Sequence, residues 1–109
     1  MALVMSHKSH TTWARLYSAV NDLATRRGSL QNRLYYALVT LSHLKVEVFP
    51  EELQADFEFL QRELAKAHPA ENEDPIEVIT RGMDDVKAEK MAKKIVEMFN
   101  RIARKYCDD

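Results

Sequence analysis

The stretch from Thr25 to Leu44, TRRGSLQNRLYYALVTLSHL, concentrates side chains that can bind anions or stack on bases. It contains Arg26, Arg27, Arg33, Tyr35, Tyr36 and His43. Arginines that follow phosphates, beside aromatic rings that stack on bases, are typical of proteins that bind single-stranded nucleic acid. A polyanion contact at Arg26, Arg27 and Arg33 is therefore one hypothesis. We rank it second, because such binders are usually strongly basic and the formal net charge here is −1.

The histidines offer little support for a metal site. They are His7, His10, His43 and His68, and no Glu-x-x-His or His-Glu-x-x-His unit accompanies them. His43 lies near the end of a predicted helix, where a histidine interacts favourably with the helix dipole. We expect neither a metal nor another cofactor.

The carboxylates and the thiol do not form a catalytic pattern. Glu51 with Glu52, and Asp84 with Asp85, lie at predicted helix starts, where acids complement the positive end of the dipole. Cys107 has no base near it in the sequence. Glycine-rich phosphate loops and a Gly-x-Ser-x-Gly motif are also missing from the sequence. We therefore expect no enzymatic activity and propose no catalytic residue.

Composition predicts a small, all-α, soluble domain. The 109 residues fit one domain, 46% are hydrophobic and 30% charged, and two glycines with three prolines leave little material for turns. A single cysteine cannot form an internal disulfide, and the start MALVMSHKSH lacks the pattern of a signal peptide. No window has the roughly 18 apolar residues of a membrane span. We expect a cytoplasmic protein that does not enter a membrane.

Apolar residues recur with helical spacing in five segments. The first stripe runs from Trp13 through Leu16 and Tyr17 to Ala24 and predicts a helix over residues 12–26, closed by Gly28. Further helices are predicted from the cap Ser29, from Pro50 at the first helical position, from the cap Asp74 to Gly82, and through residues 88–106. A break is expected near residues 82–85. The result is a compact bundle of four main helices and one short helix over residues 11–107, preceded by a disordered segment at residues 1–10.

The second helix has two apolar sides. Opposite its main stripe, Tyr35, Val39 and Val46 form a narrower strip, which indicates either a central place in the bundle or a contact with another chain. Aromatic side chains outside the main stripes can anchor interfaces. The candidate interface residues are Tyr35, Tyr36, Val39 and Phe59. The alternative, that they fill the bundle, is equally consistent with the pattern.

Charge is unevenly distributed along the chain. Residues 1–45 carry a net charge of +5, residues 46–80 of −8 and residues 81–109 of +2. This predicts that the acidic third helix packs near the basic first hairpin, or that a partner chain docks antiparallel. Within the last helix, Glu89 to Lys93 and Glu97 to Arg101 have the spacing of ion pairs on a solvated face.

Two segments, GSLQNRLYYALVTLSHLKVEVFPEELQADFEFLQREL and MDDVKAEKMAKKIVEMFNRIAR, resemble a group of short, all-helical bacterial proteins without assigned function. The shared features are a Gly-Ser helix hairpin, an FPEEL helix start and a C-terminal amphipathic helix. The resemblance spans roughly residues 12–104. It implies a bacterial origin and transfers no functional residue, because its motifs are helix caps and core positions.

The functional expectation is a small bacterial, cytoplasmic, non-enzymatic module for protein–protein interaction or regulation, which acts through helix faces. Its partner is a second copy of the chain, in a homodimer, or another protein. The alternative is a nucleic-acid-associated protein that uses a basic patch on the first hairpin and the last helix.

Overall fold

The computed structural model describes residues 7–107, and over this range the chain is helical without strands. The elements are α1 (His7–Thr25), α2 (Leu30–Ser42), the short 3-10 helix η1 (Val46–Val48), α3 (Glu51–Ala65), α4 (Pro75–Arg81) and α5 (Asp85–Cys107). The predicted all-α class is confirmed. Helix α1 begins five residues before the expected start, inside the segment predicted to be disordered, and residues 1–6 of that segment lie outside the described residues.

The hairpin between α1 and α2 forms because of Gly28 and Ser29. Gly28 has a φ of +100°, which side chains rarely adopt, so glycine allows the sharp reversal. The Ser29 side chain caps α2 by accepting a hydrogen bond from the Asn32 backbone N–H at 3.1 Å. Both predictions for this turn are confirmed. Because α1 already ends at Thr25, Arg26 lies in the connection with Arg27 and not in the helix, which was predicted to include residue 26.

Helix α3 begins one residue later than predicted. Pro50 has a ψ of 147°, so it precedes the helix as its cap, and its carbonyl accepts the first hydrogen bond from the Leu53 N–H at 2.8 Å. The preceding Phe49 is buried and stacks on Phe57 of α3, with 4.3 Å between the ring centroids. This contact fixes where the chain enters α3.

The predicted break between α4 and α5 is confirmed. Asp74 caps α4 by accepting a hydrogen bond from the Ile76 N–H at 3.0 Å, and the helix ends at Arg81. Asp84 then accepts a hydrogen bond from the Lys87 N–H at 2.8 Å at the start of α5. Because the chain leaves the helix after Arg81 and a new helix starts at Asp85, the apolar stripes of α4 and α5 are out of phase.

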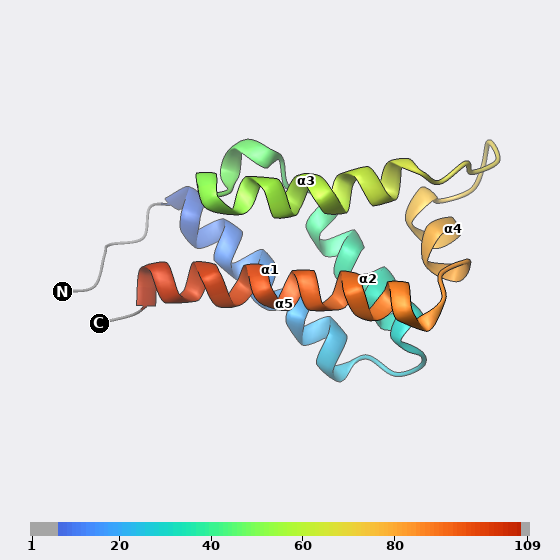
Figure 1. The fold of residues 1–109 in the computed structure, drawn as a ribbon, viewed down its shortest axis with the longest axis horizontal. Helices are drawn as coiled ribbons and strands as arrows, with labels where there is room; N and C mark the ends of the chain where they lie inside the picture. The colour runs from blue at the N-terminus through green and yellow to red at the C-terminus, as the bar shows by residue number, and fades with distance from the viewer. Residues whose placement is uncertain (1–6, 108–109) are drawn as a thin grey trace.

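Helix α5 packs against three other helices, α1, α2 and α3. It runs across the α1–α2 hairpin, while α3 lies along its other side and short α4 closes the end of the molecule (Figure 1). Its buried side chains recur at helical spacing and meet those of α1, α2 and α3 in one core: Ala88, Met91, Ile95, Met98 and Ile102. Among the described helices, none is both long and apolar enough to cross a membrane.

Candidate functional site

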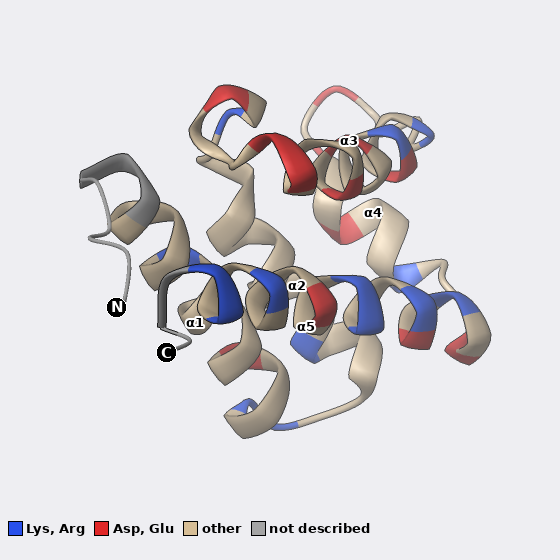
Figure 2. Cartoon of the chain, turned by 60° about the vertical axis from the view of Figure 1, so that its left-hand side comes forward, with Lys and Arg blue, Asp and Glu red and all other residues tan. Residues whose placement is uncertain are grey.

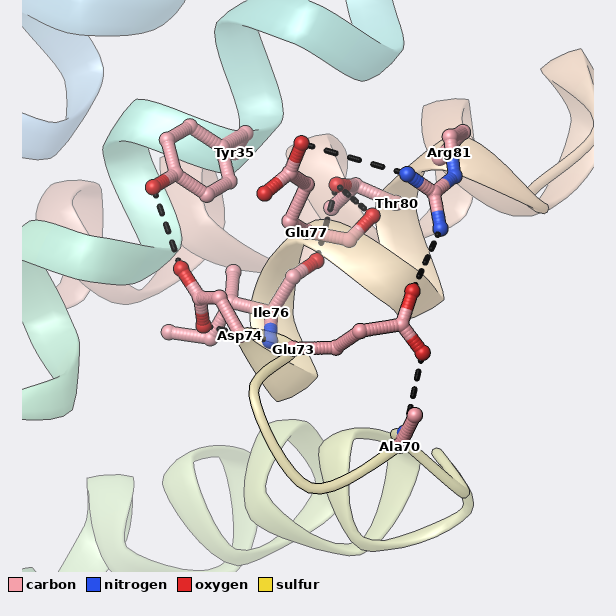
Figure 3. Close-up of polar contacts among 8 residues, drawn as sticks. All are labelled: Tyr35, Ala70, Glu73, Asp74, Ile76, Glu77, Thr80 and Arg81. Atoms are coloured by element: carbon pink, nitrogen blue, oxygen red, sulfur yellow. Dashed lines mark hydrogen bonds and ion pairs between the residues drawn. The ribbon is translucent and has the colours of Figure 1, made fainter.

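Tyr35, a predicted interface residue, is used inside the chain. Its hydroxyl donates a hydrogen bond to Asp74 Oδ2 at 3.1 Å, which ties α2 to the start of α4 (Figure 3). The other carboxylate oxygen of Asp74 caps α4, so one side chain holds both elements. The hydrogen bond to Asp74, together with burial, raises the pKa of Tyr35 above its ordinary value. Tyr35 therefore stabilises the position of α4.

The α4 segment is further held by its own charges. Arg81 lies 3.3 Å from Glu73 Oε2 and 3.9 Å from Glu77 Oε1, and Glu73 also accepts a hydrogen bond from the Ala70 N–H at 2.9 Å (Figure 3). The Ala70 N–H and then the Arg81 guanidinium lower the pKa of Glu73. These contacts close the loop before α4 onto the helix.

Tyr36 lies beside Tyr35 and faces the α1–α2 connection. The Arg26 guanidinium is 4.1 Å from the centre of the Tyr36 ring, and the two tyrosine rings meet edge to face at 5.2 Å. Both tyrosines line a hollow of about 540 Å³ between α2 and α4, together with Asn32, Glu77 and Arg81. The charged groups that line it, Glu77 and Arg81, are paired with each other. The hollow thus has the size of a small-molecule site but no converging acid and base.

Val39 and Phe59 lie in different surroundings. Val39 is half-buried on α2. Phe59, half-buried on α3, lies under the ammonium groups of Lys90 and Lys94, each 5.5 Å from the ring centre. The structure brings Tyr35 and Tyr36 together, whereas Phe59 belongs to the contact between α3 and α5.

Two of the three candidate arginines hold the first hairpin together. Arg33 donates hydrogen bonds to the Leu23 carbonyl at 2.9 Å and to the Ser29 carbonyl at 3.4 Å. Arg26 pairs with Asp22 at 3.2 Å, besides covering Tyr36. Arg27 is exposed in the connection. Two of the three guanidinium groups are thus engaged within the hairpin.

Asp22 is a structural residue that the sequence reasoning missed. It is 8% exposed and accepts hydrogen bonds from Arg26 and from the Thr40 hydroxyl of α2 at 3.0 Å. As the single acid among the first 45 residues, it was the one available counter-charge for the arginines of the hairpin. That isolation was the signal that could have identified it.

The acids of α3 pair with the basic side of α5, whereas the prediction placed their counter-charges on the first hairpin. Figure 2 shows lysines and arginines along α5 and acids on α3. Four cations of α5 reach three acids of α3 at 2.7–3.3 Å in antiparallel order: Lys87 with Glu63, Lys94 and Arg101 with Asp56, and Lys105 with Glu52. Arg101 therefore binds across the helix interface and not to Glu97, the partner that its spacing predicted.

Glu63 is the most buried acid of this contact, with a side chain 9% exposed. It receives Lys87 at 2.8 Å and Lys66 at 3.0 Å. The hydrogen bonds from Lys87 and then Lys66 lower its pKa. The pKa of Glu52 is lowered as well, mainly by the hydrogen bond from Lys105. Both carboxylates stay ionised at neutral pH and hold α3 on α5.

An exposed aromatic seam lies on the opposite side of α5, where it meets α1. We define the seam as Trp13 and Tyr17 of α1 with Val96 and Phe99 of α5. Trp13 stacks on Tyr17 at 5.7 Å, and the Phe99 ring lies 6.2 Å from Trp13 and 6.1 Å from Tyr17. Tyr17 is 54% exposed and Val96 is 46% exposed, although Tyr17 was predicted to belong to the core stripe.

Trp13 gives the seam a further unusual feature. Its indole Nε1 is buried and has no hydrogen-bond partner in the part of the chain that is described. On its outer side Trp13 stacks on His10, with 6.0 Å between the ring centroids. The row of stacked rings thus extends along α1 from Tyr17 through Trp13 to His10.

The described residues show no group of three His, Cys, Asp or Glu side chains that could hold a metal ion. His43 follows the last residue of α2 and is exposed, as predicted for a histidine at a helix end. His68 is exposed in the loop after α3. The side chains of His7 and Cys107 lie outside the described part.

Comparisons of this chain with known protein families, characterised proteins and solved structures return no match.

Proposed function

We propose that this chain is a non-enzymatic protein–protein interaction module of bacterial, cytoplasmic type, and that its working surface is the aromatic seam. The observation that carries the proposal is the exposure of Tyr17 and Val96 directly beside the buried core. Tyrosine and tryptophan are enriched where interfaces gain most of their binding energy, because they bury a large area at low entropic cost.

The edge of α2 has less support as the working surface. Phe59 lies elsewhere, on α3 under Lys90 and Lys94. At the α2 edge, Tyr35 is bound to Asp74 and Tyr36 is covered by Arg26. A partner at this edge would have to replace these contacts. The seam offers apolar surface without such a cost.

Nucleic-acid binding is the weaker alternative. Four cations of α5 are paired with acids of α3, and Arg26 and Arg33 are engaged in the first hairpin. These pairings lower the positive potential that a nucleic acid would meet. Binding to single-stranded DNA at low salt, with affinity that falls steeply as salt is raised, would favour this alternative over the interaction module.

Site-specific photo-crosslinking tests the proposed surface. A benzophenone amino acid replaces Tyr17 in the seam, Tyr36 at the α2 edge or the exposed Glu58 on α3, and the protein is irradiated in the cells that express it. We expect protein adducts from position 17 and background levels from position 58. Adducts from position 36 alone would move the interface to α2, and background levels at all three positions would contradict an interaction module.

A further inference from the structure

Two of the three large apolar side chains that are exposed in the described chain lie at the seam. They are Tyr17 and Val96, and the third, Val86, lies ten residues before Val96, about 15 Å along α5. Val96 is one helical turn before Phe99, which packs on Tyr17. At 100° per residue, Phe99 lies about 60° from Val96, so a partner that covers Val96 lies beside Phe99.

The charges around Val96 are arranged in a regular way. Glu89 precedes it by seven residues and Arg104 follows it by eight, about two helical turns in either direction. At 100° per residue, Glu89 lies about 20° and Arg104 about 80° from Val96, on the same flank of α5. Both side chains are exposed, and neither forms an ion pair with another residue in the described range. These two charges are therefore available to a partner.

The charges Glu89 and Arg104 on α5 are complementary to the same two charges on a second α5 that runs antiparallel. In an antiparallel pair of α5 helices related by a two-fold axis near Val96, Glu89 of one chain lies opposite Arg104 of the other, and the reverse contact follows by symmetry. Lys93 then lies opposite the neutral Asn100. A parallel pair would instead place Glu89 against Glu89 and Arg104 against Arg104, which is repulsive.

We propose that the occupant of the seam is a second copy of this chain, docked with its α5 antiparallel across Val96. This inference rests on the proposed function and names its partner. The two copies bury Val96 and Tyr17 at the centre and form two Glu89–Arg104 ion pairs at the rim. The seam then becomes the core of a four-helix contact between two α1 and two α5 helices.

The first test is the solution mass, measured by light scattering after size exclusion over a concentration series. We expect twice the 12.7 kDa of one chain, with dissociation at low concentration. Val96→Asp places a charge at the centre and should give a monomer with unchanged helix content, because Val96 is already 46% exposed in one chain. A wild type that is monomeric at all concentrations, or a dimer that survives Val96→Asp, overturns the proposal.

Charge reversal tests the antiparallel register of the two α5 helices without changing Val96 at the centre of the contact. Glu89→Arg and Arg104→Glu should each weaken self-association on the order of ten-fold, since each creates two like-charge contacts. The double variant exchanges the two charges and should restore the wild-type dissociation constant to within a few-fold. Glu58→Arg and Arg62→Glu, exposed on α3, are the matched controls and should change nothing. A double variant that does not regain the wild-type dissociation constant overturns the antiparallel register of the two α5 helices.

The crosslinking experiment separates this inference from the proposed function. Position 17 adducts with the mass of two chains support self-association. Adducts with a different protein, together with a monomeric wild type, overturn self-association and leave the interaction module intact. Background levels at positions 17 and 36 overturn both.

Discussion

Gly28 is the residue at which the backbone most needs glycine. Its φ is +100°, and a Cβ added there would lie 3.0 Å from Asn32 Nδ2. Asn32 cannot move freely, because its side chain donates a hydrogen bond to the Arg27 carbonyl at 2.8 Å. A side chain at position 28 would therefore cause both backbone strain and a steric conflict with Asn32.

The Gly28→Ala variant should lower the free energy of unfolding by about 1–2 kcal/mol, the usual cost of holding a side chain in this region of φ. Gly82→Ala is the matched control, since φ at Gly82 is −87° and an added Cβ would meet the Val78 carbonyl at an ordinary 3.6 Å. We expect that change to stay within about 0.5 kcal/mol. Urea unfolding followed by circular dichroism measures both, and equal losses would contradict the assigned role of Gly28.

At the level of elements, the contact between α3 and α5 depends on charge. Lys87, Lys94 and Arg101 are seven residues apart, about two helical turns, so they form one row on α5. Asp56 and Glu63 have the same spacing on α3. The two rows match when the helices run antiparallel, which fixes their register as well as their proximity.

This contact should make stability depend on acid pH. The pKa of Glu63 is lower in the folded chain than its ordinary value of 4.5, so the unfolded chain takes up the proton first as pH falls. The stabilisation is complete above about pH 5 and is lost as pH falls through the folded pKa. Glu63→Gln should therefore be less stable than wild type at pH 7, by about 1–2 kcal/mol, the order of a lost hydrogen bond to a charged group. This difference in unfolding free energy should narrow as the pH falls toward 3.

Urea unfolding at several pH values checks this expectation. Glu58→Gln is the control, because Glu58 is exposed on the same helix. Its unfolding free energy should follow that of the wild type throughout. A Glu63→Gln curve parallel to the wild-type curve between pH 7 and pH 3 would show that Lys87 and Lys66 do not act on this carboxylate.

At the level of the whole molecule, one core joins the helices. Ile95 is fully buried, in a cluster that includes Leu16 of α1, Leu38 of α2 and Leu60 of α3. A chain with a single shared core is expected to unfold in one cooperative step. Local opening of one helix would then require disruption of the others.

Ile95→Ala should destabilise the chain by about 2–5 kcal/mol. Fluorescence of Trp13, which reports on the α1–α5 contact, and circular dichroism, which reports on all helices, should shift to the same lower urea midpoint. Val86→Ala, at a site 77% exposed on the same helix, should change stability by less than about 0.5 kcal/mol. Separate midpoints for the two probes would show that α1 and α5 unfold apart from the rest.

The sequence by itself determined the helix class and most helix ends. The caps at Ser29 and Asp74 and the turn at Gly28 were predicted correctly, because each depends on one residue and its neighbours within three or four positions. The break before α5 was predictable for the same reason. Pro50 was misplaced by one position because proline tolerates both the cap and the first helical position.

Only the tertiary structure decided which side chains meet. Periodicity placed Tyr17 in an apolar stripe, but it lies about 100° around α1 from Leu16, and burial at that edge depends on how closely α5 approaches. Charge composition predicted that acidic and basic segments compensate each other, but not that α3 pairs with α5. Local rules act within a few residues, whereas helix packing is set by the whole core. The seam, and the availability of Glu89 and Arg104 beside it, could therefore be recognised only in the folded chain.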